Sequence, residues 1–275
     1  MAPSAAAATP LEQALSLPQL LLSPPPKART PRDGVTPVLR NAQPTGRSAR
    51  LSGTISVMST LLPLSPDELL ATTRAVRKRL DFDREVPSEM IDECVHLATQ
   101  APSASNMQGW HFVVIDDPAK KMAIADLYRQ GFEMYRTMPM AAGNIITGEA
   151  SRDAQQQRVM GSAEYLAEHF HRAPYLVIPC LEGRFDGAPN MVASSMLGSI
   201  LPAMWSFMLA ARSRGLGTSW TTIHLMFERE AAEVLGIPFD EITQTCLTPV
   251  AFTLGTDFKE AARAPLDKIV HRNTW

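Results

Sequence analysis

The stretch "APSASNMQGWHFVVID", residues 101–116, leads from the end of a helix through a polar loop into a strand. Pro102 ends the helix, and the β-branched and aromatic run 110–116 predicts the strand. Upstream, one helical face is apolar, with Met90, Ile91, Cys94, Val95 and Ala98 at helical spacing. The loop offers neutral hydrogen-bond donors and acceptors on Ser103, Ser105, Asn106 and Gln108. Such groups suit either helix capping or the polar edge of an uncharged heterocycle.

The rest of the chain alternates helical and strand patterns. Ser65 as N-cap and Pro66 at the first helical position predict a helix that runs to about Arg79. Further helices are predicted over 118–135, 153–171, 191–214 and 228–236, and strands over 174–181, 217–225 and 247–255. Pro179 indicates an edge or a bulge in its strand. Because most helices come in pairs between strands, the pattern predicts an α+β layer rather than a strict βαβ fold.

The bulk composition is that of an ordinary globular protein, with 45% hydrophobic residues and 20% charged residues. A net charge of −2 gives no global field that would attract nucleic acid or an anionic membrane. The helix predicted over 191–214 is apolar on nearly every side, but Pro202 and four serines interrupt its apolar stretch 191–211, so we interpret it as a buried helix. No histidine or cysteine spacing indicates a metal site.

Cys94, Cys180 and Cys246 are far apart in the sequence and lie among apolar neighbours. This indicates core thiols rather than a disulfide framework, and a reducing compartment such as the cytoplasm.

Residues 1–60 differ from the rest of the chain. They are Ala-rich and then rich in Pro, Ser and Arg, with hardly any acidic residue and no periodicity. Such a composition predicts a disordered N-terminal extension ahead of a folded domain over 61–275. The extension is either a dispensable leader, for which Met58 is a natural alternative start, or a transit peptide without a clear amphipathic helix.

A basic cluster lies near the end of the first predicted helix, in Arg74, Arg77, Lys78 and Arg79. It is either a solvated face or an anion site, since two guanidinium groups three residues apart on a helix can clasp one phosphate. No nucleophilic triad, paired carboxylates, Walker loop or GxGxxG occurs in the sequence. If the chain is an enzyme, we therefore expect a bound cofactor to carry its chemistry.

Several motifs in order resemble the nitroreductase family of FMN-dependent oxidoreductases. They are "TRAVRKR", "FDREVP", "APSASNMQGW", "HFVVIDDP", "GLGTSW" and "RAPLDKIVH", and the likeness runs from about Thr72 to the C-terminus. The resemblance implies an α+β fold with a central, mostly antiparallel sheet flanked by helices. It also implies an intertwined homodimer with two FMN molecules at the subunit interface, and a C-terminal tail that reaches across to the partner.

The same resemblance assigns cofactor-binding residues. Arg74, Arg77 and Arg263 match the basic residues at the FMN phosphate, and Ala75 stands where many members have a phosphate-binding serine. The loop that contacts the flavin ring, from the other subunit, matches Pro102, Ser103, Ala104 and Asn106, with Gln108 nearby. Trp220, Thr221 and Thr222 match the segment beside the flavin N5 edge. The opening loop would thus hold the uncharged rim of the flavin.

The implied activity is a ping-pong cycle in which NADH or NADPH reduces the flavin at N5 and an electrophilic organic acceptor reoxidises it. A nitroaromatic compound, a quinone or an unsaturated metabolite would serve as acceptor, and no protein residue need act as acid or base. Thr222-Ile223 replaces the Glu-Gly pair of classical members, and Gly109 stands where proline is frequent. The hydride donor stays open, as do dehalogenation, reverse dehydrogenation, and a flavin-binding storage or sensing role without turnover.

Segment 128–172 is a candidate lid over the flavin, because methionine and aromatic side chains suit adaptable binding. Core packing explains the same side chains equally well, namely Tyr128, Phe132, Met134, Tyr135, Met138 and Met140.

Overall fold

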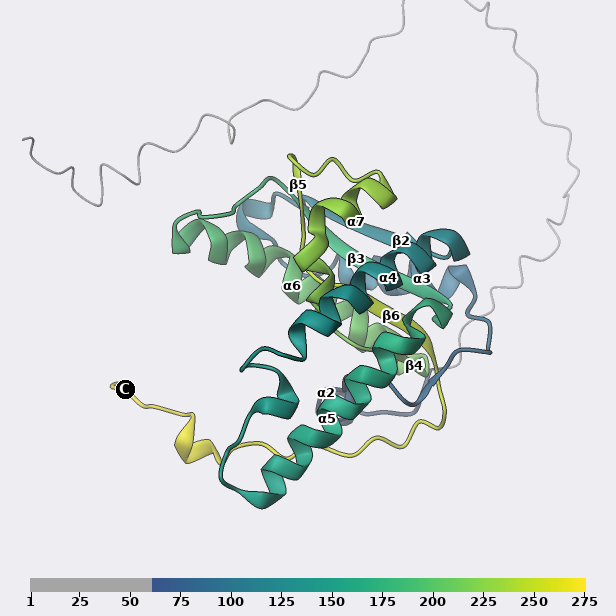
Figure 1. Ribbon diagram of the computed structural model, residues 1–275. Coiled ribbons are helices and arrows are strands. Elements are labelled where there is room, and N and C mark those ends of the chain that lie inside the picture. Colours follow the sequence, from purple (N-terminus) through teal and green to yellow (C-terminus); the bar gives the residue numbers. More distant parts are fainter. Residues whose placement is uncertain (1–60) are drawn as a thin grey trace, which may run out of the picture. The chain divides into compact units, whose positions relative to one another are not determined.

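The computed structural model describes residues 61–275, and the extension predicted over 1–60 lies outside the described residues. A six-stranded sheet forms its centre (Figure 1). The order is β1-β6-β3-β2, with β4 paired to β6 and β5 paired to β3, and every one of these ladders is antiparallel. The strands are β1 (Leu80–Asp81), β2 (Trp110–Ile115), β3 (Tyr175–Glu182), β4 (Leu216–Thr218), β5 (Ile242–Gln244) and β6 (Thr248–Thr253). The predicted α+β class and antiparallel sheet are confirmed.

Helices cover both faces of the sheet. On one face lie α4 (Pro118–Tyr135), α5 (Ala150–His169) and α7 (Glu228–Leu235), and on the other lie α3 (Ser88–Ala98) and α6 (Asn190–Ser213). Side chains of β3 alternate between the two layers: Leu176 and Ile178 pack with α4 and α5, and Val177 packs with α3 and α6. This period of two is what a strand buried on both faces requires. The predicted positions of these helices are confirmed within a few residues.

β3 is an internal strand, so the edge expected at Pro179 is wrong, whereas the alternative, a bulge, agrees with the interrupted pairing on one side of Pro179. One side of β3 pairs with β2 along its length, including Pro179 with Phe112. On the other side, β6 pairs up to Val177 and β5 takes over from Cys180. Pro179 lies in the gap between these two partners, where its missing N–H interrupts no ladder, and its carbonyl accepts a bond from the Thr245 amide at 3.1 Å.

The first helix is shorter than predicted. α2 (Pro66–Thr72) begins at Ser65 with a capping box to Glu68, as the sequence indicates, but ends at Thr72 rather than near Arg79. The Thr72 and Thr73 hydroxyls bond back to carbonyls four residues earlier, at 2.6 Å each. From there the chain is extended, because the Val76 amide donates to the Thr218 carbonyl of β4 at 2.8 Å.

The strand predicted over 217–225 is also shorter. Only Leu216–Thr218 pairs with β6, and Thr221 forms one further bridge to Leu247. The chain then turns into a short 3-10 helix, η5 (Ile223–Phe227). The β-branched residues of this segment favour a strand, but strand propensity has no effect where no partner strand is available.

The remaining short elements are 3-10 helices. They are η2 (Ala104–Asn106), η3 (Ala142–Asn144), η4 (Phe170–Arg172) and η6 (Leu266–Lys268).

Helix α6 is long and apolar enough to cross a membrane by length and composition alone. Its C-terminal half belongs to the core, since Met204 and Phe207 are fully buried against α3 and the sheet. Its N-terminal half is open within residues 61–275, and Met191 is 70% exposed. The predicted buried helix is therefore confirmed for about half its length.

All three cysteines are buried, which confirms their prediction as core thiols. Burial raises the pKa of Cys94, Cys180 and Cys246 to about 12. Their thiols therefore stay protonated and unreactive at neutral pH.

Helix α4 contacts η5 so closely that Gly131 has no room for a side chain. A Cβ at this position would lie 2.7 Å from Ile223 Cγ2 and 3.0 Å from the Ile223 carbonyl oxygen. Gly131→Ala should therefore lower the free energy of unfolding by about 1–3 kcal/mol, measured by urea denaturation. Gly161→Ala in α5 is the matched control, because a Cβ there meets nothing within 4 Å. Helix propensity alone should make this control stabilising by about 0.5–1 kcal/mol, and equal losses in both variants would contradict the steric explanation.

Candidate functional site

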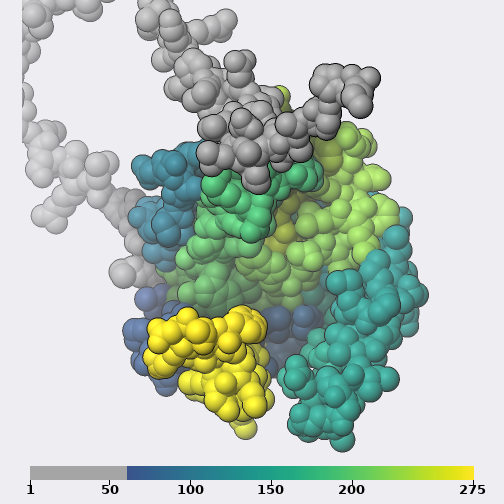
Figure 2. All heavy atoms as spheres, turned by 90° about the vertical axis from the view of Figure 1, so that its left-hand side faces the viewer, coloured from purple at the N-terminus to yellow at the C-terminus, as the bar shows by residue number. Residues whose placement is uncertain are grey.

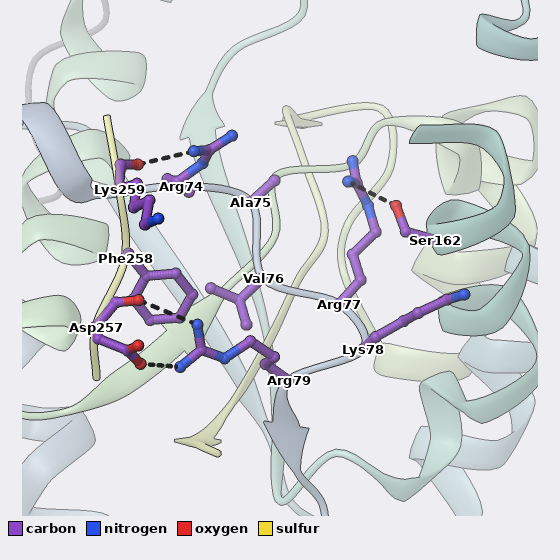
Figure 3. A pocket seen from close by; sticks show the side chains of 10 residues that line it. All are labelled: Arg74, Ala75, Val76, Arg77, Lys78, Arg79, Ser162, Asp257, Phe258 and Lys259. Carbon is purple, nitrogen blue, oxygen red and sulfur yellow. Dashed lines mark hydrogen bonds and ion pairs between the residues drawn. The ribbon is translucent and has the colours of Figure 1, made fainter. Parts of the chain in front are cut away.

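The basic cluster does not lie on a helix: Arg74 is in an extended segment, and Arg77, Lys78 and Arg79 are in the bend and turn that follow it. The prediction that Arg74 and Arg77 are neighbours on one helix face is therefore wrong. Their guanidinium groups are nevertheless brought to one side of the chain, with Ala75 between them (Figure 3). The bridge between Ala75 and Thr218 fixes this segment along β4. Arg79 extends the other way, towards Asp257 and Phe258 (Figure 3). The sheet rather than a helix thus orients the two arginines.

The segment borders a cavity of about 480 Å³, here called the anion cavity. Five cationic side chains and one acidic side chain are among the residues that line it. The lining residues are Arg74, Ala75, Val76, Arg77, Lys78, Arg79, Ser162, Asp257, Phe258 and Lys259. The single acid, Asp257, is paired with Arg79 at 2.8 Å. Within residues 61–275 no carboxylate pairs with Arg74 or Arg77. The anion cavity therefore has a local surplus of positive charge in a chain whose net charge is −2.

Hydrogen bonds hold the two arginines in place. Arg74 Nη1 donates to the Lys259 carbonyl at 2.8 Å, and Arg77 Nη1 donates to Ser162 Oγ on α5 at 3.4 Å. Burial lowers the pKa of the Arg77 guanidinium, but an arginine in a protein stays charged at neutral pH. Figure 2 shows a hollow between the C-terminal tail and the α4–α5 hairpin, with early residues of the described chain at its base. Two guanidinium groups on the lining of one cavity suit a phosphate group.

The second predicted group, Trp220 to Thr222, follows β4 directly and so lies close to the arginine segment. Thr221 is buried and its hydroxyl donates to the Leu247 carbonyl at 2.7 Å. The Tyr128 hydroxyl also bonds the Thr221 side chain and feels the positive charge of Arg77. Burial raises the pKa of Tyr128 to about 12, so this phenol stays protonated. Tyr128 thereby interacts with one residue of each predicted group, Thr221 and Arg77.

The third predicted group, the loop from Pro102 to Gln108, does not line the anion cavity. It is attached to α6 instead: Ser199 Oγ accepts the Ala104 amide at 2.9 Å, and the Ser199 carbonyl accepts Trp110 Nε1 at 2.7 Å. Asn106 and Gln108 have φ of 54° and 53°, in the left-handed region. Internal bonds hold this shape, including Gln108 N to Ser103 Oγ at 3.1 Å.

Arg263 also lies outside the anion cavity of its own chain. It is exposed, and its Nη1 contacts only the neighbouring Ala262 carbonyl, at 3.4 Å. One chain thus brings Arg74, Ala75 and Arg77 to the anion cavity. The Trp220 to Thr222 segment follows β4 beside them but does not line this cavity, and the loop and Arg263 lie elsewhere.

Several lining residues were not predicted. Lys78 and Arg79 belong to the basic cluster that the sequence indicates as a possible anion site, but they were not assigned to the cofactor. Ser162, Phe258 and Lys259 come from α5 and the tail, and carry no local sequence signal.

The six side chains of the candidate lid differ in burial: two are in the core, two (Tyr135 and Met138) are half-buried and two are exposed. Tyr128 and Phe132 are 2% and 1% exposed and belong to the core, so the packing explanation is correct for them. Met134 and Met140 are 51% and 71% exposed on the α4–α5 hairpin, so they stay candidates for contact with a ligand.

The match to the Nitroreductase family model spans residues 70–255, and the chain belongs to this family. It is 26% identical over 185 residues to 4-nitrobenzoate reductase of Nocardioides sp. (strain LMS-CY), covering 62% of this chain and 74% of that protein.

Two solved structures share the fold at a TM-score of 0.57 each. An iodotyrosine deiodinase bound to FMN and 3-iodo-L-tyrosine is 20% identical, covering 76% of this chain and 99% of the other. An FMN- and NADPH-dependent nitroreductase of Sphigopyxis sp. strain HMH is 18% identical, covering 77% and 100%. The predicted family and fold are thus confirmed. No group of three or more histidine, cysteine, aspartate or glutamate side chains gathers in the described part of the chain.

The attachment of the loop to α6 makes a prediction. Ser199→Ala removes the acceptor of the part-buried Ala104 amide, so we expect a loss of about 1–2 kcal/mol in unfolding free energy and faster amide hydrogen exchange over 103–108. Ser194→Ala, on an exposed turn of the same helix, is the control and should change neither quantity. Unchanged exchange in the Ser199 variant would show that this bond does not hold the loop.

His224 in η5 makes stability depend on pH. It is fully buried and neither ring nitrogen has a hydrogen-bond partner, and burial lowers its pKa to about 3. The unfolded chain therefore takes up a proton below about pH 6.5 that the folded chain excludes, so stability falls as the pH is lowered. Between pH 7 and pH 5 the loss from this group should be about 2 kcal/mol. Urea denaturation of His224→Leu should show a correspondingly smaller pH dependence, and an unchanged one would refute this role.

Proposed function

We propose that the protein is an FMN-dependent oxidoreductase that transfers a hydride from NADH or NADPH to an electrophilic organic acceptor, such as a nitroaromatic compound, a quinone or an unsaturated metabolite. The observation that supports this most directly is the pair of uncompensated guanidinium groups on either side of Ala75 in the anion cavity. A phosphate monoester carries nearly two negative charges and presents oxygens that two such forks can bind. The residues present therefore fit the phosphate end of FMN.

The chain's own residues would bind and orient the cofactor. Arg74 and Arg77 would bind the phosphate, and the small side chain of Ala75 leaves room between them. Trp220, Thr221 and Thr222 would lie along the ring, held by the Thr221 bond to Leu247. When bound, the flavin supplies a ring nitrogen, N5, that accepts and donates hydride.

No protein side chain is proposed as a catalytic acid or base. Tyr128, which interacts with Arg77, is protonated and buried, so its role is to hold Thr221 in place rather than to exchange protons. Solvent would provide the proton for the acceptor.

We also propose that the active form is an intertwined homodimer. Three observations support this: the predicted site is incomplete in one chain, the N-terminal half of α6 exposes Met191, and the tail exposes apolar side chains at 48–101%. These tail residues are Leu266, Ile269, Val270 and Trp275. In this arrangement the loop from Pro102 to Gln108 and Arg263 would complete the partner's site. Residues 61–275 would form the FMN-binding domain, with the cytoplasm as its location.

Dehalogenation is the second candidate, supported by the likeness to the deiodinase fold. The absorbance spectrum of the purified protein tests the class, since bound flavin absorbs in the blue. Anaerobic reduction by NADH and by NADPH, followed by a panel of nitroaromatic, quinone and halogenated acceptors, then separates the activities. A coloured protein that oxidises neither nucleotide with any acceptor would indicate a storage or sensing role.

The assigned arginines make a quantitative prediction. Arg77→Met and Arg263→Ala should each weaken FMN binding about ten- to a hundred-fold, since each removes a charge-assisted contact of about 1.5–3 kcal/mol. Fluorescence titration with FMN measures the dissociation constant. Arg129→Met is the control, because this arginine pairs with Asp126 on α4. An unchanged constant for Arg263→Ala in a dimeric protein would remove Arg263 from the site.

A further inference from the structure

The C-terminal tail leaves the sheet along residues 254–259, here called the tail root. Arg79 fastens its first part: Nε donates to the Leu254 carbonyl at 2.8 Å, and Nη2 pairs with Asp257 at 2.8 Å (Figure 3). The Arg79 guanidinium also lies 4.2 Å from the centre of the Phe258 ring. The tail root is thus held against the same segment that lines the anion cavity.

Arg212, in the last turn of α6, holds the tail root from behind. It is only 3% exposed, and Nη2 donates to the Thr256 carbonyl at 2.9 Å and to Thr72 Oγ1 at 3.3 Å. Its guanidinium lies 4.9 Å from the Phe258 ring, on which Arg79 also stacks. Its Nε and Nη1 have no hydrogen-bond partner, and within residues 61–275 no carboxylate pairs with it.

A buried guanidinium without a counter-ion is costly, because desolvation of the charge is not offset by an ion pair. If Arg212 served only to fill space in the core, methionine or leucine would serve as well. The positive charge of Arg212 is therefore explained if it acts on the neighbouring anion cavity. Phe258, which Arg212 contacts, lines that cavity, and so does the next residue, Lys259, whose carbonyl accepts the Arg74 guanidinium at 2.8 Å.

We infer that Arg212 is a positioning residue of the anion cavity. It fixes the tail root so that the Lys259 carbonyl orients Arg74, and it adds a positive charge behind the Phe258 ring that the bound anion compensates. This inference rests on the proposed function, in which that anion is the FMN phosphate. Arg212 makes no contact with the phosphate itself and acts through Phe258, Lys259 and Arg74.

Comparison of FMN with riboflavin, which lacks the phosphate, tests this role in the full-length protein. Arg212→Met keeps the length of the side chain but removes the charge and the bond to Thr256. We expect its dissociation constant for FMN to rise about tenfold, the size of charge coupling across roughly 10 Å of protein, and that for riboflavin to change by less than about twofold. Arg212→Lys keeps the charge and should retain most of the preference for FMN.

Arg214→Met is the matched control at the same helix end, since Arg214 pairs with Glu93 on α3 at 3.0 Å. Its ratio of FMN to riboflavin affinity should equal that of the wild type. If Arg212→Met does not fold, Phe258→Leu, which removes only the stacked ring, should lower the ratio about threefold.

An Arg212→Met protein that loses both flavins equally, or keeps the wild-type ratio, would overturn the inference and leave the proposed function intact. The same holds for an unchanged ratio in Phe258→Leu. A wild-type protein that binds neither flavin would overturn both.

Discussion

The hydrogen bond from the Val76 amide to the Thr218 carbonyl is the contact on which the candidate site depends. It holds the segment after α2 against β4 and so prevents the helix from continuing through the basic run. Arg74 and Arg77 then extend to one side of an extended chain, with only Ala75 between their guanidinium groups. Because β4 continues into Trp220 to Thr222, the same pairing brings the second predicted group close to the first.

Much of the fold could be predicted from local patterns. Helical periodicity located α3, and capping residues located the start of α2 and the end of α7, where Gly236 takes φ 71°. Failures occurred where long-range pairing overrides local preference. The early end of α2 could not be predicted, because it depends on pairing with a strand more than a hundred residues away in the sequence. The early end of β4 could not be predicted either, because it depends on the absence of a partner strand beyond Thr218 in the described residues. β1 and β5, with two and three residues, are too short to show any period.

The site was predictable to a similar degree and for similar reasons. The motif resemblance indicated Arg74, Ala75 and Arg77, which the structure brings to one cavity. Ser162, Phe258 and Lys259 reach it from α5 and from the tail, and isolated residues of these types carry no signal of their own. The loop after Pro102 is bonded to α6 and lies outside that cavity. In the proposed homodimer its contact with a flavin would come from the partner chain, and the sequence of one chain carries no local signal of such an arrangement.

The burial of every thiol has a practical consequence for studying the tail. The sequence contains three cysteines, and all of them are in the core with pKa values of about 12. A cysteine introduced at an exposed tail position such as Thr274 would therefore be the one thiol open to a spectroscopic label, without removal of any native residue. Spin or fluorescent probes placed there could report where the tail lies and whether it crosses to a second chain.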